Sequence, residues 1–335
     1  MNRFPETGED DGDDGDDGDE TETVGILERF LVEDNDMEIG ILYESKEWSS
    51  YELEKDINAL GVTAKLIDVE QDDNEDEILA CDMIVNRVFA SAVFRRHQKS
   101  LDRMPHIIGL MKARGIPMIN PYEAHFYEIS KALSTTTLAN NEFLVPEMYG
   151  VFTPEQLLSD LGNLSTLGNK GIEYPCIVKP NCGGRTNYTF IVKDHSELVG
   201  SMKTAPNIEF IAEEYIKPEY GFLTRIEIID RSCKLILKRS VTENGLSAYH
   251  LGSVYAAYDD CCNMIRETAV KAMDCLHIET GSMDIIENNR GFYIIDINSV
   301  SNVSEDNTEM FSFDLMKETA AYIVKKYRQL KGEAL

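Results

Sequence analysis

The sequence predicts a mixed fold, in which an α/β lobe is followed by lobes of the α+β class. Strand and helix patterns alternate from residue 37 to about residue 125, which is typical of a parallel sheet with crossover helices. Short apolar runs joined by tight turns begin at residue 174 and favour antiparallel pairing. A last pair of apolar runs, 282–287 and 292–298, predicts a closing hairpin.

Length and composition indicate a globular protein of more than one lobe. The chain has 335 residues, of which 43% are hydrophobic, so it can bury a sizeable core. Its longest apolar runs fall far short of the roughly 20 residues that a membrane span requires. The N-terminus is acidic, whereas a secretory signal begins with basic residues. We therefore expect a cytoplasmic protein without a membrane partner.

The charge is strongly negative and unevenly spread. A net charge of -28 argues against a nucleic-acid partner, because phosphate binding needs clustered Lys and Arg. Residues 1–38 hold 16 Asp or Glu and 2 Arg, about half of the excess. The glycine- and carboxylate-rich segment 8–23 cannot offset its chain entropy by burying apolar surface. We expect an acidic disordered tail at 1–36, with a short amphipathic helix within 24–34.

The first lobe is expected to contain three strands followed by a repeat of helix and strand. The predicted strands cover residues 37–45, 62–69 and 81–88, the last after an acidic turn. A helix over 48–61 ends at Gly61. The segment 106–120 contains a helix, a glycine stop and a strand, and one long helix is then predicted over 123–141.

The rest of the chain predicts antiparallel pairing. A strand ends at Lys179, the loop 181–187 turns the chain, and 188–192 returns. Further elements are expected as the strand 210–216, a hairpin over Arg231 and Ser232, a helix at 263–278 and a closing helix near 314–330.

Two carboxylates and an amide are expected to converge on the last hairpin. With a loop at 289–291 and Gly291 in the left-handed position, the pairing places Asp284 opposite Asp296. Side chains repeat every two residues along a strand, so Asn298 projects on the same face. Opposed like charges are destabilising without a cation, and oxygen ligands suit Mg²⁺. The alternative interpretation is a solvated hairpin face.

Lys179 stands before a loop that contains Gly183 and Gly184. Glycines allow backbone N–H groups to close on an anion, and the lysine would add a point charge to a phosphate. The motif is neither GxxxxGK[ST] nor GxGxxG, so on its own it is also consistent with an ordinary hairpin turn.

Other basic residues lie within apolar segments, where an unpaired charge costs free energy. Lys131 and Arg225 are such residues, and we expect both to be functional. Lys238 and Arg239 are adjacent on a predicted strand, so only one of them can face inward. We choose Arg239.

Taken in order, these residues resemble the ATP-grasp superfamily. The resemblance rests on Lys131 in ISKALS, on Lys179 in IVKP with its glycine loop, on the strand AEEYI, and on the later arginines, aspartates and asparagine. It covers about 37–330 and looks closest to the glutathione synthetase and ribosomal-protein glutamate ligase (RimK-like) branch. It implies an N-terminal Rossmann-like pre-ATP-grasp domain at 37–125, a lid domain at 126–215 and a C-terminal antiparallel-sheet domain at 216–335.

The resemblance also implies roles for individual residues. Arg225 and Arg239 would neutralise the transferred phosphate and the acyl phosphate. Asp284, Asp296 and Asn298 would hold Mg²⁺, with two ions expected and Mn²⁺ as an alternative. The implied ATP contacts are Lys131, Lys179, Gly183, Gly184, Arg185, Glu213, Glu214, Tyr215 and Ile216.

The chain departs from the family pattern near the substrates. Asp296 stands where relatives usually have Glu, and Leu223 stands where they often have an acidic residue, which leaves Glu219 as the candidate ribose contact. The Pro-Gly turn that commonly follows the asparagine is absent after Asn298. Arg87 resembles a contact to a substrate carboxylate, although by sequence alone it would be an ordinary strand-edge residue.

The resemblance implies an ATP- and Mg²⁺-dependent ligase that joins a carboxylate to an amine or peptide acceptor through an acyl phosphate. Three alternatives stay open: a small-molecule kinase on the same fold, a ligase that modifies or macrocyclises a peptide, and an ATP-binding module without turnover. In the peptide alternative, the segment ILERFLVED and the carboxylates before it resemble a leader and substrate fused to the enzyme. A homo-oligomer is also left open.

Overall fold

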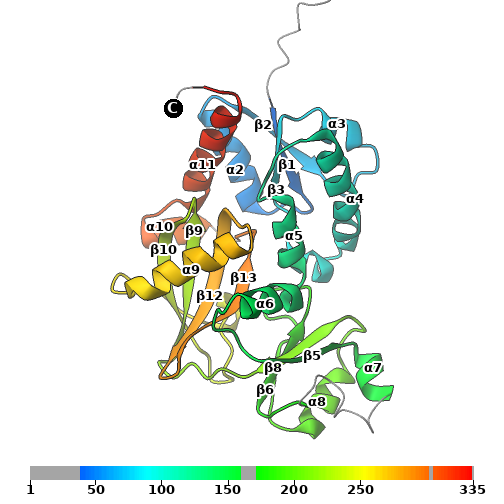
Figure 1. The fold of residues 1–335 in the computed structure, drawn as a ribbon, viewed down its shortest axis with the longest axis vertical. Coiled ribbons are helices and arrows are strands. Elements are labelled where there is room, and N and C mark those ends of the chain that lie inside the picture. The colour runs from blue at the N-terminus through cyan, green and yellow to red at the C-terminus, as the bar shows by residue number, and fades with distance from the viewer. Residues whose placement is uncertain (1–37, 160–170, 302–304, 334–335) are drawn as a thin grey trace, which may run out of the picture. The chain divides into compact units, whose positions relative to one another are not determined.

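A computed structural model describes residues 38–159, 171–301 and 305–333 (Figure 1). The predicted acidic tail and the amphipathic segment at 24–34 lie outside the described residues. Within these ranges the strands form three sheets, one parallel and two antiparallel. No helix there has the length and apolar character needed to cross a membrane. The predicted fold class is confirmed, whereas the domain boundaries at 125/126 and 215/216 stay predictions.

The first sheet is parallel and has the order β2-β1-β3-β4. Its strands are β1 (Glu38–Tyr43), β2 (Thr63–Asp68), β3 (Met83–Asn86) and β4 (Met118–Ile119). Ile39, Ile41 and Leu42 of β1 are fully buried, as expected of a strand that is covered on both faces. The following helices belong to this lobe: α2 (Trp48–Ala59), α3 (Glu75–Leu79), the 3₁₀ helix η2 (Ala90–Phe94) and α4 (Gln98–Arg114).

The acidic turn predicted before β3 forms the short helix α3. Glu75, Asp76 and Glu77 occupy its first turn, where negative charges interact favourably with the helix dipole. The helix α4 ends as predicted at Gly115, whose φ of 69° is left-handed, although α4 begins eight residues earlier than the segment 106–120.

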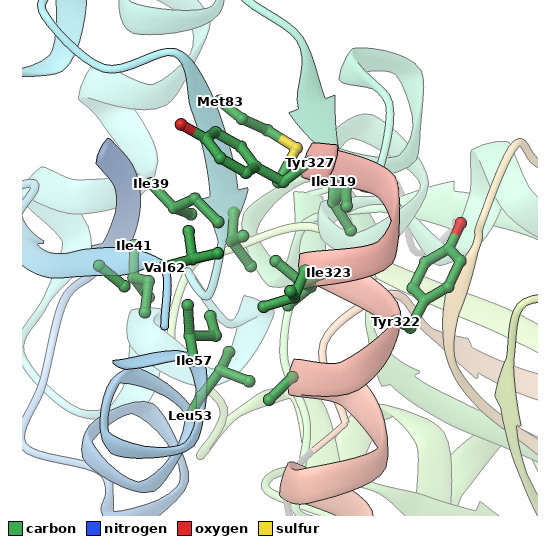
Figure 2. Close-up of a cluster of buried hydrophobic side chains, with 14 of the residues drawn as sticks. Ile39, Ile41, Leu53, Ile57, Val62, Met83, Ile119, Tyr322, Ile323 and Tyr327 are labelled. Atoms are coloured by element: carbon green, nitrogen blue, oxygen red, sulfur yellow. The ribbon is translucent and has the colours of Figure 1, made fainter. Parts of the chain in front are cut away.

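The last helix, α11 (Leu315–Leu330), packs on the first sheet. Ile323 and Tyr327 of α11 lie in one buried cluster with Ile39 of β1 and with Leu53 and Ile57 of α2 (Figure 2). Burying such side chains is worth roughly 1.5–3 kcal/mol each. The chain therefore returns from the third sheet to complete the core of the first.

The single helix predicted over 123–141 is wrong, because the chain forms two helices, α5 (Tyr122–Ile129) and α6 (Lys131–Asn140). Ser130 between them is extended, and its Oγ accepts a hydrogen bond from Leu133 N, which caps α6. Asn181 O accepts a hydrogen bond from Lys131 N, and Asn181 Oδ1 accepts one from Ala132 N. The break thus places Lys131 at the start of α6, beside the loop that follows Lys179.

The second sheet is antiparallel and has the order β5-β8-β6-β7. Its strands are β5 (Met148–Phe152), β6 (Cys176–Pro180), β7 (Phe190–Val192) and β8 (Phe210–Glu214). The helices α7 (Pro154–Ser159) and α8 (His195–Met202) contribute Leu157, Leu198 and Met202 to its core. The predicted return of the chain after the glycine loop is confirmed by the pairing of β6 with β7.

The third sheet has the order β11-β10-β9-β12-β13, and all its pairs are antiparallel. Its strands are β9 (Phe222–Ile229), β10 (Ser232–Ser240), β11 (Tyr255–Ala257), β12 (Thr280–Asn288) and β13 (Gly291–Asn298). The helix α9 (Asn263–Cys275) shares a hydrophobic cluster with β9 and β12. The short helices η4 (Tyr249–Leu251) and α10 (Glu305–Phe311) complete the described elements.

The β9–β10 hairpin turns one residue earlier than predicted. Its two central residues are Asp230 and Arg231, with φ of 51° and 58°. Both values are left-handed, as a two-residue turn of type I′ requires. Aspartate tolerates this conformation better than most residues with a side chain.

His125 is a buried titratable group of α5, near the end of β3. Its Nδ1 lies 3.3 Å from Asn86 Nδ2, and its Nε2 has no hydrogen-bond partner within the described chain. Burial lowers the pKa of His125 to about 4, whereas an unfolded histidine titrates near pH 6.5. The native state therefore binds this proton at lower pH than the unfolded state does, and stability falls as the pH drops from about 6.5 towards 4.

We expect His125 to contribute about 2 kcal/mol to the loss of unfolding free energy between pH 7 and pH 5. Urea unfolding at both pH values would measure the loss of unfolding free energy, and His125→Gln should remove the part of that loss that His125 contributes. His106 is the matched control, because its ring is exposed and lies 3.0 Å from Glu75. Equal pH dependence in wild type and His125→Gln would contradict the expectation.

Candidate functional site

Asp284 of β12 lies directly opposite Asp296 of β13, as the sequence predicts. The predicted loop 289–291 is nevertheless wrong, because Asn288 pairs with Gly291 and only two residues turn the chain. A register shift between Asp284 and Ile285, with an extra residue on β13, restores the predicted pairing. Two carboxylates therefore face each other at the centre of the site.

Two arginines hold Asp284, one from the adjacent strand β9 and one from β10, the next strand beyond it. Arg239 of β10 donates from Nη2 to Asp284 Oδ2 at 2.7 Å, and Arg225 of β9 lies 3.5 Å from Asp284 Oδ1. All three side chains are largely buried. Burial alone would raise the pKa of Asp284, but the two guanidinium groups outweigh it and hold that pKa below its ordinary value.

Lys131 pairs with the second carboxylate. Its Nζ donates to Asp296 Oδ1 at 2.6 Å, and the start of α6 directs the side chain towards β13. Burial would lower the pKa of Lys131, yet the nearby carboxylates, Asp296 foremost, raise it. Each aspartate of the hairpin is thus neutralised by a basic residue from another element.

Lys179 also points into the site. Its Nζ donates to Ile295 O at 2.9 Å, next to Asp296, and lies 2.8 Å from Glu213 Oε2. The pair with Glu213 is an ion pair whose angles are poor for a hydrogen bond. Lys179 is largely buried, so it is not an ordinary surface charge.

The glycine loop after β6 needs glycine at residue 183. Gly183 has φ of 149°, and a Cβ there would lie 2.5 Å from the ring of Phe94 in η2. Arg185 and Thr186 follow with left-handed φ values of 59° and 53°. Arg185 Nη2 donates to Glu47 Oε1 at 2.8 Å. The loop therefore packs against the first lobe while its backbone borders the site.

Two cavities meet at the hairpin carboxylates. The smaller cavity, of about 130 Å³, is lined by the residues predicted to contact ATP. The larger, of about 380 Å³, is lined by Arg225 and Asn298. Both are bordered by Asp284, Asp296, Arg239 and the glycine loop. This arrangement offers one compartment to each of two reactants, with the charged groups between them.

Apart from Glu219 and Arg87, every residue predicted for the site lines one of the two cavities. The smaller cavity is bordered by Lys131, Lys179, Gly183, Gly184, Arg185, Glu213, Glu214, Tyr215, Ile216, Arg239, Asp284 and Asp296. Arg225 and Asn298 line only the larger one. This proximity does not by itself assign roles to the residues.

Glu213 and Glu214 end β8, two residues earlier than the predicted strand 210–216, and Tyr215 and Ile216 follow along the smaller cavity. Glu214 Oε1 accepts a hydrogen bond from Arg290 Nη1 at 2.8 Å, which ties this segment to the β12–β13 turn. Glu219, the candidate ribose contact, accepts from Asn289 N instead, and Leu223 borders the cavity.

Of the adjacent residues Lys238 and Arg239, only Arg239 faces inward, while its functional role stays a prediction. Arg239 is buried against Asp284, whereas Lys238 lies over the ring of Tyr258 on the other face of β10 and is 3.9 Å from Asp260.

Arg87, the predicted contact to a substrate carboxylate, does not border either cavity. Its Nη2 donates to Ser49 Oγ and to Ser301 O, and burial lowers its pKa to about 10, so it remains charged at neutral pH.

Two buried carboxylates of the larger cavity were missed by the sequence analysis. Glu128 of α5 accepts hydrogen bonds from Ala90 N and Ser299 N at 3.2 and 2.6 Å, and burial raises its pKa. Glu227 of β9 lies two residues after Arg225. That two-residue spacing on a predicted strand was the available signal, because it places both side chains on one face.

The possible metal ligands are oxygen atoms. Among the residues that the structure describes, no three His, Cys, Asp or Glu side chains gather closely enough to hold a metal ion. The predicted set instead combines two aspartates with Asn298, which borders the larger cavity together with both of them. Its donors suit a hard cation, which would compete with Lys131 and Arg239 for the carboxylates.

Comparisons with known proteins agree with this fold. Residues 130–324 match the RimK-like ATP-grasp domain family. A D-alanine–D-alanine ligase of Pediococcus pentosaceus is 29% identical over 140 residues, which are 38% of this chain and 39% of that ligase. The chain thus aligns with well under half the length of this relative.

Solved structures share the fold at low sequence identity. A D-alanine–D-alanine ligase from Bacillus anthracis complexed with ATP has a TM-score of 0.62 and 16% identity, over 89% of this chain and 100% of that one. The macrocyclase MdnC from Microcystis aeruginosa, bound with precursor peptide MdnA, has a TM-score of 0.56 and 15% identity, over 86% of this chain and 100% of that one. The ATP-grasp ligase PsnB, complexed with a precursor variant, Mg and ADP, has a TM-score of 0.59 and 12% identity, over 87% of this chain and 99% of that one.

Proposed function

This chain belongs to the RimK-like ATP-grasp family, and we propose that it is an ATP- and Mg²⁺-dependent ligase that joins a carboxylate to an amine. The observation that carries the proposal is the convergence of Lys131, Lys179, Arg225 and Arg239 around the paired aspartates, at the junction of two cavities. Phosphoryl transfer needs little covalent chemistry from the protein, so positioned charges account for most of the catalysis.

The smaller cavity is the proposed ATP site. Lys131 and Lys179 would bind the phosphates, and the end of β8 would offer backbone groups to the base. Asp284, Asp296 and Asn298 would hold Mg²⁺, or Mn²⁺ in its place. The metal would supply charge neutralisation and alignment of the phosphate oxygens. Fluorescence or calorimetric titration with ATP would measure this binding directly.

The larger cavity is the proposed site of the other substrates. In the first step a carboxylate oxygen attacks the γ-phosphorus, the bond to the β-phosphate oxygen breaks, and ADP leaves. In the second step an amine nitrogen attacks the acyl carbon, inorganic phosphate leaves with its bridging oxygen, and the nitrogen loses a proton. Arg225 and Arg239 would hold the phosphoryl oxygens through both steps, so that no nucleophilic side chain is required.

A second candidate is a ligase that modifies a peptide. Two observations favour it: the substrate cavity, at about 380 Å³, is the larger of the two, and both PsnB and MdnC were solved with precursor peptides. If the chain acted on its own acidic N-terminus, incubation with ATP and Mg²⁺ would lower its intact mass by whole water molecules. An unchanged mass would contradict modification of the chain by itself.

A screen for phosphate release tests the proposed function. Purified protein, ATP and Mg²⁺ would be combined with amino acids and short peptides, alone and in pairs. We expect release of phosphate only when a carboxylate and an amine are both present, with a condensed product seen by mass spectrometry. Turnover without either substrate, or transfer of phosphate to a hydroxyl group, would overturn the proposal.

A further inference from the structure

Arg225 is held by a carboxylate on its own strand. Its Nε donates to Glu227 Oε1 at 2.8 Å, and the Glu227 side chain is only 3% exposed. The two residues are separated by one position on β9, so their side chains project from the same face of the sheet. Both border the larger cavity, yet the proposed chemistry uses only the arginine.

Glu227 is itself fixed from its other side. Its Oε2 accepts a hydrogen bond from Ser301 Oγ at 2.7 Å. Ser301 O in turn accepts from Nη2 of Arg87, at 3.1 Å, and the same Nη2 donates to Ser49 Oγ. Glu227 therefore connects Arg225 to the segment that follows Asn298 and to the end of β3.

This connection decides where the guanidinium of Arg225 points. Arg225 lies opposite Asp284 on β12, and Asp284 already has a shorter contact with Arg239. Without a partner at Nε, Arg225 could move from its long 3.5 Å contact to a short bond with Asp284, and would then compete for an oxygen that a cation needs. With Nε bonded to Glu227 and Nη2 to Ser282 Oγ, the planar group is fixed at two of its nitrogens.

We propose that Glu227 is a positioning residue, which holds Arg225 so that its guanidinium borders the substrate cavity and approaches Asp284 no closer than 3.5 Å. The inference rests on the proposed ligase function for the role of Arg225. The orientation of the guanidinium, however, can be measured without any substrate. The two parts of the proposal can therefore fail separately.

The test compares Glu227→Gln and Ser301→Ala with wild type by two measurements. The first is the solvent-exchange rate of the Arg225 Nε proton by NMR, with the resonance identified by its loss in Arg225→Lys. The second is ATP turnover with the substrates found in the screen. The matched control is Asp274→Asn, because Asp274 makes the same bond, at 2.8 Å, to Nε of the exposed Arg231.

We expect Glu227→Gln to raise the Arg225 Nε exchange rate at least about tenfold and to lower kcat by about 10- to 100-fold, with the KM for ATP changed less than about threefold. Ser301→Ala should shift both values in the same direction by a smaller factor. The control should leave kcat unchanged. If Glu227→Gln does not fold, as judged by circular dichroism, the exchange rate and kcat of Ser301→Ala alone test the proposal.

Several results would overturn the inference. One is an unchanged exchange rate in the variants, and another is faster exchange with unchanged kcat. Equal loss of kcat in the Asp274→Asn control would also count against it, since that loss would reflect general destabilisation. If wild type shows no ATP turnover, the ligase proposal fails, and the exchange rate alone then supports or refutes the positioning of Arg225 by Glu227.

Discussion

Replacing Arg239 with methionine should lower ATP turnover by about 1,000-fold, the size of effect seen for arginines that neutralise a transferred phosphoryl group. Arg239 is buried, donates to Asp284 at 2.7 Å and to Ser247 Oγ at 3.0 Å, and borders both cavities. Methionine keeps most of the side-chain volume but removes the charge. Steady-state phosphate release and calorimetric binding of ADP would separate turnover from nucleotide affinity.

The same substitution should reduce the free energy of unfolding. Breaking a buried ion pair by removing one partner costs about 3–5 kcal/mol, because the other charge is left without compensation. We expect the lower end of this range, since Arg225 still lies 3.5 Å from Asp284. Urea unfolding without nucleotide measures this cost, and turnover must be assayed at a temperature at which the variant remains folded.

Lys238→Met is the matched control, since it makes the same change of charge one residue earlier on β10. Lys238 lies on the opposite face of the strand, partly exposed, and 3.9 Å from Asp260. Exposed pairs of this kind contribute about 0–1 kcal/mol. Turnover should therefore stay within about twofold of wild type. Similar losses in both variants would show that Arg239 acts through the general charge of the strand and not through the site.

Local patterns in the sequence are sufficient to predict the paired carboxylates. The two-residue period of a strand and the position of a tight turn determine which side chains oppose each other. The predicted turn was one residue too long, but the extra residue on β13 compensated and left Asp284 opposite Asp296. A bulge of this kind depends on the neighbouring strands, so the correct pairing was reached through a wrong loop.

The position of Lys131 shows where local patterns fail. A helix-forming pattern continues through Ser130, and sequence periodicity gives no reason to interrupt it. The interruption is stabilised by Asn181, 50 residues later in the chain, which accepts hydrogen bonds from the N–H groups of Lys131 and Ala132. The resemblance to a known family identified the lysine, whereas the bend that directs it to Asp296 is a tertiary effect.

Glu128 and Glu227 were overlooked for a related reason. A carboxylate in an amphipathic helix or strand is usually a solvated surface group, and only the folded chain shows that these two are buried beside the larger cavity. Arg87 illustrates the opposite case, because the basic residue predicted to contact a substrate is already bonded to Ser49 and Ser301. The sequence alone does not reveal which charged side chains are buried by residues that are distant in the chain.

Asp296→Asn should lower Mg²⁺-dependent turnover by about 100- to 1,000-fold, comparable with removing one preorganised electrostatic group. The amide oxygen of asparagine is a weaker ligand for a hard cation than a carboxylate. Asp296 also neutralises Lys131 at 2.6 Å, so the variant leaves that lysine with less compensation. We expect the Mg²⁺ concentration for half-maximal turnover to rise together with the loss of kcat.

Asp296→Glu separates these two effects, because it keeps the charge and lengthens the side chain by one methylene group. If metal binding is what Asp296 provides, the glutamate variant should retain turnover within about tenfold of wild type, since carboxylates bind such cations in several geometries. Titration with Mg²⁺ and with Mn²⁺ would compare all three proteins. A half-saturating Mg²⁺ concentration that is the same in Asp296→Asn as in wild type would remove Asp296 from the metal site and leave it as the partner of Lys131 alone.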